Sequence, residues 1–200
     1  MTGEAILLAR LVFHLMPDEP EAAGLLALLV LTQSRRAARV QADRLVSLDE
    51  QDRSLWGADL IAEGHALVRA CLRRGLPGPF QIQAAINAVH TDAATAADTD
   101  WSQVLAFYDQ LYAVTPTPVV GLNRAIAMGE IEGAAAGLAA LDAVPGMEAL
   151  AAYHPLHATR AELLRRAGQG ARARATYDRA LGLVTNPAER ALLAGRRDAL

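Results

Sequence analysis

The chain has 200 residues, of which 52% are hydrophobic and 4% aromatic, and its formal net charge is -3 at pH 7. This length suffices for one large domain or two small ones, and a slightly acidic chain is not expected to bind nucleic acid over its whole surface. The longest nearly apolar run, residues 22–31, is about half of the roughly 20 residues that span a bilayer. The single cysteine, Cys71, allows no intramolecular disulfide. We therefore expect a cytoplasmic protein without a membrane span.

The composition predicts an all-α protein. Alanine is abundant, aromatic residues are few, and continuous runs of Val, Ile and Thr are absent. Such a composition favours closely packed helices over sheets.

The first part of the chain, residues 1–99, is expected to be helical with one irregular connection. Residues 4–16 predict a helix whose apolar stripe should be buried against a partner; the stripe comprises Leu7, Leu8, Leu11, Val12 and Leu15. Residues 19–38 predict a central helix that starts at an Asp18 cap. Residues 40–51 break the helical period and indicate a connector with a short extended piece.

The next helix is predicted over residues 52–74, with the preceding charged residues at its start and Gly75 at its end. Pro79 suits the first position of a further helix over residues 80–90. Residues 91–99 are small and polar and indicate a loop, after which Asp100 has the spacing of a helix cap.

In the second part, residues 100–200, a pair of helices joined by a turn recurs with a period of about 34 residues. Small residues at Ala173 and Ala180, with Tyr177 between them, predict a close helix pair that resembles the second helix of a tetratricopeptide repeat. Residues 119–145 read as another pair, hinged near Gly129 and Glu130. Potential caps stand before three prolines, at Thr117, His154 and Asn186.

About nine helices result, arranged as antiparallel helix pairs in a tetratricopeptide-like α-solenoid with a concave, binding face. The two parts of the chain, residues 1–99 and 100–200, either form separate lobes or continue as one domain.

Motifs for phosphate, dinucleotide or zinc-protease chemistry are absent from the sequence, and we expect no cofactor and no metal. His154 and His157 have a spacing that could offer two zinc ligands, but capping and packing roles are favoured because further ligands are not apparent. The cluster of Asp49, Glu50 and Asp52 beside Arg53 could hold a divalent ion or act as paired carboxylates. A capping, salt-bridging loop is the favoured interpretation, and a structural role is favoured for His90.

Two further features could belong to a binding surface. Trp56 and Trp101 could anchor a partner, although core positions are more usual for tryptophan in an aromatic-poor chain. Asn123 and Arg124 could line a concave groove and grip a peptide backbone or carboxylate.

A series of short motifs occurs in an order that resembles a known family. The series comprises Glu4-Ala-Ile-Leu-Leu-Ala-Arg10, Pro17-Asp-Glu-Pro-Glu21, Gly24-Leu-Leu-Ala-Leu28, Ser34-Arg-Arg-Ala-Ala-Arg39, Asp49-Glu-Gln-Asp-Arg-Ser54 with Trp56, Gly78-Pro-Phe-Gln-Ile-Gln-Ala-Ala-Ile86 with His90, Thr99-Asp-Trp101, Pro118-Val-Val with Asn123-Arg-Ala125, and His157 to Arg166. Over essentially its whole length the chain resembles the C-terminal extension of bacterial extracytoplasmic-function RNA polymerase sigma factors, a helical domain with tetratricopeptide-like repeats.

The resemblance implies a regulatory module that contacts the sigma core regions or RNA polymerase. The promoter-reading sigma regions are not visible in the 200 residues, so we expect no direct DNA contact and regard the chain as an excised fragment or a natural remnant. The residues expected to contact a partner are Asp49, Asp52, Arg53, Trp56, Gln81, Gln83, Asn123 and Arg124.

Replacing Arg53 or Asn123 by Ala is expected to weaken regulation while changing stability by less than about 1 kcal/mol. A stand-alone repeat scaffold for an unrelated peptide is the second hypothesis. An enzyme that uses the acidic Asp49–Asp52 loop with His90 is the third and least favoured one.

Overall fold

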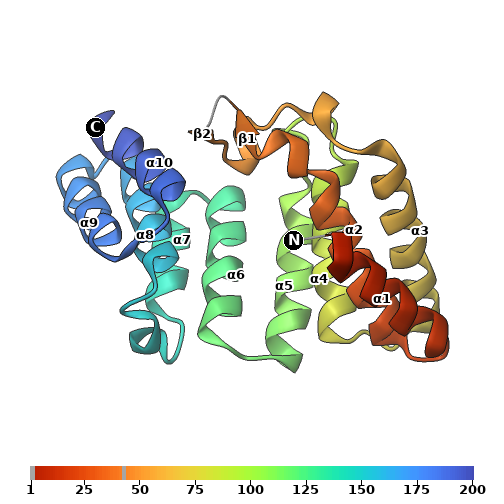
Figure 1. The fold of residues 1–200 in the computed structure, drawn as a ribbon. Coiled ribbons are helices and arrows are strands. Elements are labelled where there is room, and N and C mark those ends of the chain that lie inside the picture. The colour runs from red at the N-terminus through yellow and green to blue at the C-terminus, as the bar shows by residue number, and fades with distance from the viewer. Residues whose placement is uncertain (1–2, 42–43) are drawn as a thin grey trace. The chain divides into compact units, whose positions relative to one another are not determined.

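The structure, a computed structural model, describes residues 3–41 and 44–200, and over those ranges it contains ten α-helices and one pair of short strands (Figure 1). The helices are α1 (Gly3–Leu15), α2 (Pro20–Ser34), α3 (Ala58–Arg74), α4 (Pro79–Asp92), α5 (Trp101–Val114), α6 (Pro118–Ile131), α7 (Ala134–Asp142), α8 (His154–Arg166), α9 (Gly170–Leu183) and α10 (Pro187–Asp198). The strands β1 (Val40–Gln41) and β2 (Arg44–Leu45) pair with each other. The prediction of an all-α fold of packed helix pairs is confirmed, with ten α-helices in these ranges where about nine were expected.

The chain forms two compact units. Unit 1 consists of the described residues of Met1–Val40 together with Val46–Thr115, and unit 2 consists of Pro116–Leu200 with the described residues of Gln41–Leu45. Helix α5 belongs to unit 1 because it packs on α4. The boundary between the units therefore lies after Thr115, one helix later than the boundary at residue 100 that the sequence indicates.

Helix α2 is the centre of unit 1, as its apolar sequence predicts, and it packs against α1, α3 and α4. Ala27, Val30 and Leu31 are fully buried in its middle. Gly24 allows a close approach to α4, since a Cβ atom at this position would lie 2.6 Å from the backbone nitrogen of Gln81. The close packing of α4 on α2 therefore requires glycine at position 24.

Helices α6 to α10 of unit 2 pack in chain order, each against the next. Ala173, Tyr177 and Ala180 of α9 are fully buried, as the repeat pattern predicts. The predicted helix pair over residues 119–145 is confirmed as α6 and α7. Its turn lies slightly later than expected, because α6 continues through Gly129 and Glu130 and the turn follows at Gly133, whose φ is 93°. Gly129 and Gly137 allow α6 and α7 to pack closely, since a Cβ atom at Gly137 would lie only 2.9 Å from the Cα atom of Gly129.

Most predicted helix ends are confirmed by their capping hydrogen bonds. The side chains of Asp100, Thr117 and Asn186 each accept a hydrogen bond from a backbone N–H in the first turn of α5, α6 and α10. Gly75 follows α3 in the left-handed conformation with φ 66°. His154 is instead the first residue of α8 and does not cap it.

Two helices of unit 1 differ from their predicted boundaries. Helix α3 begins at Ala58 and not near residue 52, because Asp52 caps a separate 3-10 helix, Arg53–Leu55. Helix α2 is capped by Glu19 and not by Asp18, and it ends at Ser34 before a 3-10 turn.

Helix α1 buries a different face from the one predicted. Ile6 and Ala9 are buried, with Phe13 packed beside them. The predicted leucine stripe faces away from α2, and within the described residues Leu8, Leu11 and Leu15 are 63%, 52% and 68% exposed. No described helix is long and apolar enough to cross a bilayer.

Candidate protein-interaction site

The loop before α3 contains the first group of residues predicted to contact a partner. Asp49 lies exposed in the 3-10 helix Leu48–Glu50. The carboxylate of Asp52 accepts hydrogen bonds from the hydroxyl and the backbone N–H of Ser54, and these bonds lower its pKa. Asp49 is thus open to solvent, whereas one oxygen of Asp52 is occupied in a local turn.

Arg53 fastens this loop to the C-terminal end of α4. Its Nη1 donates to the carbonyl oxygens of His90 at 2.6 Å and Ala93 at 2.7 Å. Carbonyl groups at a helix C-terminus lack partners within the helix and carry partial negative charge, so a guanidinium suits them. The same guanidinium lies 4.5 Å from the ring centroid of Trp56, which is 7% exposed.

The structure therefore gives Arg53 and Trp56 roles inside unit 1. Trp56 occupies the core, the alternative favoured for tryptophan in the sequence analysis. Arg53→Ala removes two charged hydrogen bonds. We therefore expect it to lower the unfolding free energy by more than the limit of about 1 kcal/mol that the sequence suggested.

His90 lies half-buried in a cationic part of the same unit. Its ring packs edge-on against Trp101, with the centroids 5.3 Å apart. Burial, together with the nearby charges of Arg35 and Arg53, lowers the pKa of His90 to about 4. Burial and the charges of Arg39 and Arg53 likewise lower the pKa of Arg35 to about 10. His90 is consequently neutral at physiological pH.

Gln81 and Gln83 lie at the start of α4 and are engaged within the chain. Gln81 is buried, and its Nε2 donates to a carboxylate oxygen of Glu21 at 3.0 Å and to the carbonyl of Leu76 at 2.9 Å. The Glu21 carboxylate also accepts from the first N–H groups of α4 and so caps this helix from α2. Gln83 donates to the carbonyl of Pro79. Neither glutamine presents its amide nitrogen freely to a partner.

Asn123 and Arg124 lie on α6 of unit 2, so they belong to a different compact unit from the loop and the glutamines. The side chain of Asn123 donates to the carbonyl of Val119, one turn earlier on the same helix. Both residues are partly exposed. The residues predicted as one contact group are thus distributed over the two units.

A groove in unit 1 was not predicted from the sequence. Helices α3 and α5 both pack on α4, and the groove has two adjoining hollows of about 500 and 280 Å³. Val68, Leu72, Ala85 and Phe107 line both hollows, which makes them two ends of one groove. We call it the α3–α5 groove. The sequence periodicity predicts each helix that forms a wall of the groove. It does not predict how far apart these helices lie, because that distance depends on tertiary packing.

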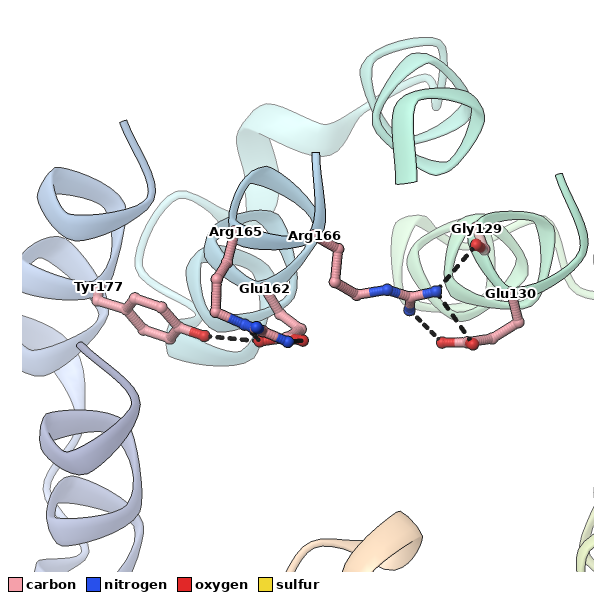
Figure 2. Close-up of polar contacts among 6 residues, drawn as sticks. All are labelled: Gly129, Glu130, Glu162, Arg165, Arg166 and Tyr177. Atoms are coloured by element: carbon pink, nitrogen blue, oxygen red, sulfur yellow. Dashed lines mark hydrogen bonds and ion pairs between the residues drawn. The ribbon is translucent and has the colours of Figure 1, made fainter. Parts of the chain in front are cut away.

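In unit 2, polar side chains join α6, α8 and α9 (Figure 2). Glu162 accepts hydrogen bonds from Arg165 and from the hydroxyl of buried Tyr177 at 2.9 Å. Burial alone would raise the pKa of Glu162, but the hydrogen bonds and charge of its partners outweigh burial and lower it. Arg166 forms an ion pair with Glu130 and also donates to the carbonyl of Gly129. These contacts fix α6 and α9 to α8.

The two histidines with a possible ligand spacing have separate partners. A ring nitrogen of His157 lies 2.9 Å from the carbonyl oxygen of Ala151, and His154 lies 3.3 Å from a carboxylate oxygen of Glu189. Over residues 3–41 and 44–200, no group of three or more His, Cys, Asp or Glu side chains is arranged to hold a metal ion.

Comparisons with known proteins show sequence similarity to one family and to one longer protein. Residues 1–72 match the model of a family of unknown function (DUF6596). An uncharacterized protein of Rhizobium meliloti (strain 1021) is 43% identical over 201 residues, which cover 100% of this chain and 47% of that protein. No solved structure matches the chain significantly. The chain is thus similar along its whole length to a segment that makes up about half of a longer protein, and its first 72 residues are similar to DUF6596.

Proposed function

We propose that this chain is the regulatory, protein-binding module of a bacterial extracytoplasmic-function RNA polymerase sigma factor. In this role it acts in the cytoplasm during transcription initiation and contacts the sigma core regions or RNA polymerase. It contacts no promoter DNA itself and catalyses no reaction.

The sigma-factor part of the proposal is supported by the ordered series of motifs between Glu4 and Arg166. The length of the relative agrees with this proposal, because the similar segment makes up 47% of that protein. A module that acts on neighbouring sigma regions would be part of such a longer chain.

The exposed stripe of α1 is the observation that carries the protein-binding part. Leu8, Leu11 and Leu15 follow one face of the helix and are more than half exposed, while the opposite face already packs on α2. Burying the exposed part of each leucine is worth on the order of 1–2 kcal/mol. An apolar face of this kind typically marks an interaction site, and we propose that it packs on the sigma regions that precede this module in a full-length factor.

The test is co-purification of this chain with separately expressed sigma core regions. The variant combines Leu8→Glu with Leu15→Lys, which keeps the net charge and places a cation near the end of α1 where it suits the helix dipole. We expect binding about 100-fold weaker, because about 3 kcal/mol of apolar burial is removed. The matched control combines Leu55→Glu with Ile131→Lys, since it charges two exposed apolar positions outside α1 and also keeps the net charge.

The proposal fails if the unaltered chain binds neither the sigma core regions nor polymerase. It also fails if the α1 variant binds as tightly as the control while remaining helical by circular dichroism.

A stand-alone scaffold that binds an unrelated peptide is the alternative, and it would use the same fold. The coding sequence next to this module distinguishes the two functions. The sigma-factor proposal requires coding sequence for the promoter-reading sigma regions fused to, or directly upstream of, this module, whereas the scaffold requires none.

A further inference from the structure

The α3–α5 groove combines an apolar end with an acidic end. The smaller hollow is lined by uncharged side chains, among which Leu72 and Leu76 remain 57% and 70% exposed. The larger hollow is lined by Asp92, Asp98 and Asp100, with Arg69 as its one arginine. The groove therefore changes from apolar to net negative along its length.

Two of the three carboxylates at this acidic end accept hydrogen bonds from neighbouring residues. Asp98 accepts hydrogen bonds from Thr95, and Asp100 caps α5. The side chain of Asp92 is 84% exposed and lies 4.0 Å from a ring nitrogen of His65. Asp92 is thus the carboxylate of this group most available to a partner, and the other two add to the local negative potential.

The length and walls of the groove indicate the form of its occupant. Its floor on α4 runs from Gln81 to Asp92, which is about 17 Å or three helical turns. The walls are α-helices, whose interior N–H and C=O groups are paired within each helix, so an extended segment could not add to them as it adds to the edge of a sheet. A helix pairs its own backbone groups and needs only side-chain pockets.

We propose that the α3–α5 groove binds an amphipathic helix of a protein partner, with leucine-like side chains in the apolar end and lysine or arginine side chains at the acidic end. The apolar residues occupy the hollow at Leu72 and Leu76, and the basic residues face Asp92. This inference rests on unit 1 alone and does not depend on the sigma-factor proposal or on α1.

The test uses fluorescence anisotropy with synthetic labelled helical peptides of about 12 residues, the length that matches the groove. One peptide carries leucines at helical spacing and three lysines at one end, a second has its lysines at the other end, and two matched peptides carry glutamate in place of lysine. We expect one of the lysine peptides to bind at least about tenfold more tightly than either glutamate peptide. The difference should shrink in about 0.5 M salt, where exposed charges are screened.

Two variants with matched controls locate the binding site. Leu72→Gln is expected to weaken binding of the lysine peptide about tenfold, whereas Leu55→Gln, which alters an exposed leucine outside the groove, should leave it unchanged. Asp92→Asn is expected to weaken binding about threefold, and Asp59→Asn on the exposed first turn of α3 is its control.

Two results would overturn the inference: equal or absent binding of the lysine and glutamate peptides, or full binding by a folded Leu72→Gln variant. The Leu8→Glu, Leu15→Lys variant should bind the lysine peptide normally, because its changes lie on α1. Failure at the groove is therefore distinguishable from failure of the sigma-factor proposal.

Discussion

His90 packs half-buried against Trp101 and is affected by the nearby charges of Arg35 and Arg53, so acid should weaken unit 1 through this side chain. Its pKa is about 4 in the folded chain, against an ordinary value of 6.5. Because the folded pKa is the lower one, the stabilising contribution is complete above pH 6.5. It is lost as the pH falls from 6.5 to about 4, where the unfolded chain binds a proton that the folded chain does not.

The difference between 6.5 and about 4 corresponds to about 3 kcal/mol of unfolding free energy. Most of this loss, about 2–3 kcal/mol, should have occurred by pH 4.5. Urea unfolding followed by tryptophan fluorescence measures it, since both tryptophans of the chain, Trp56 and Trp101, lie in unit 1.

His90→Phe is the comparison, because it keeps a ring against Trp101 but cannot bind a proton. All other titrating groups are present in both proteins, so the difference between the two pH profiles reports His90. The unaltered chain should lose about 2–3 kcal/mol more than the variant between pH 7.5 and 4.5. Parallel profiles would refute the description of His90 as a half-buried imidazole that stays neutral in the folded chain.

Two substitutions test other contacts of unit 1 by the same unfolding measurement. Arg53→Ala should lower the unfolding free energy by about 2–4 kcal/mol, because two carbonyl groups at the end of α4 lose a charged donor and Trp56 loses its cation; a loss below about 1 kcal/mol would mean that these bonds are not maintained in solution. Gly24→Ala should cost about 2 kcal/mol or more, since the new Cβ would lie 2.6 Å from the backbone nitrogen of Gln81. At a helix position without such a neighbour, the same change stabilises by up to about 1 kcal/mol, so a stabilised variant would contradict the close approach of α2 and α4.

Local sequence chemistry predicted the helices and many of their ends. Asp100, Thr117 and Asn186 cap helices through atoms only two or three residues away, and Gly75 ends α3 through its own backbone conformation. Interactions of this range depend little on the rest of the fold, so sequence patterns predict them well.

Features that depend on packing between distant segments were harder to predict. The α1 sequence has apolar residues on two faces. Its pattern therefore does not predict that Ile6 and Ala9 pack on α2 while the leucine stripe stays exposed. The bond from Arg53 to the end of α4 joins residues 37 positions apart. Likewise, the α3–α5 groove exists because two helices flank a third, which periodicity in any one of them does not reveal.

The central claim is that this helical module binds another polypeptide through the outer face of α1. Hydrogen exchange measured by mass spectrometry, on the chain alone and mixed with sigma core regions, tests this claim directly. Exchange at Gly3–Leu15 should become slower in the mixture, because a helix covered by a partner opens less often. Identical exchange along the whole chain with and without the sigma regions would contradict it.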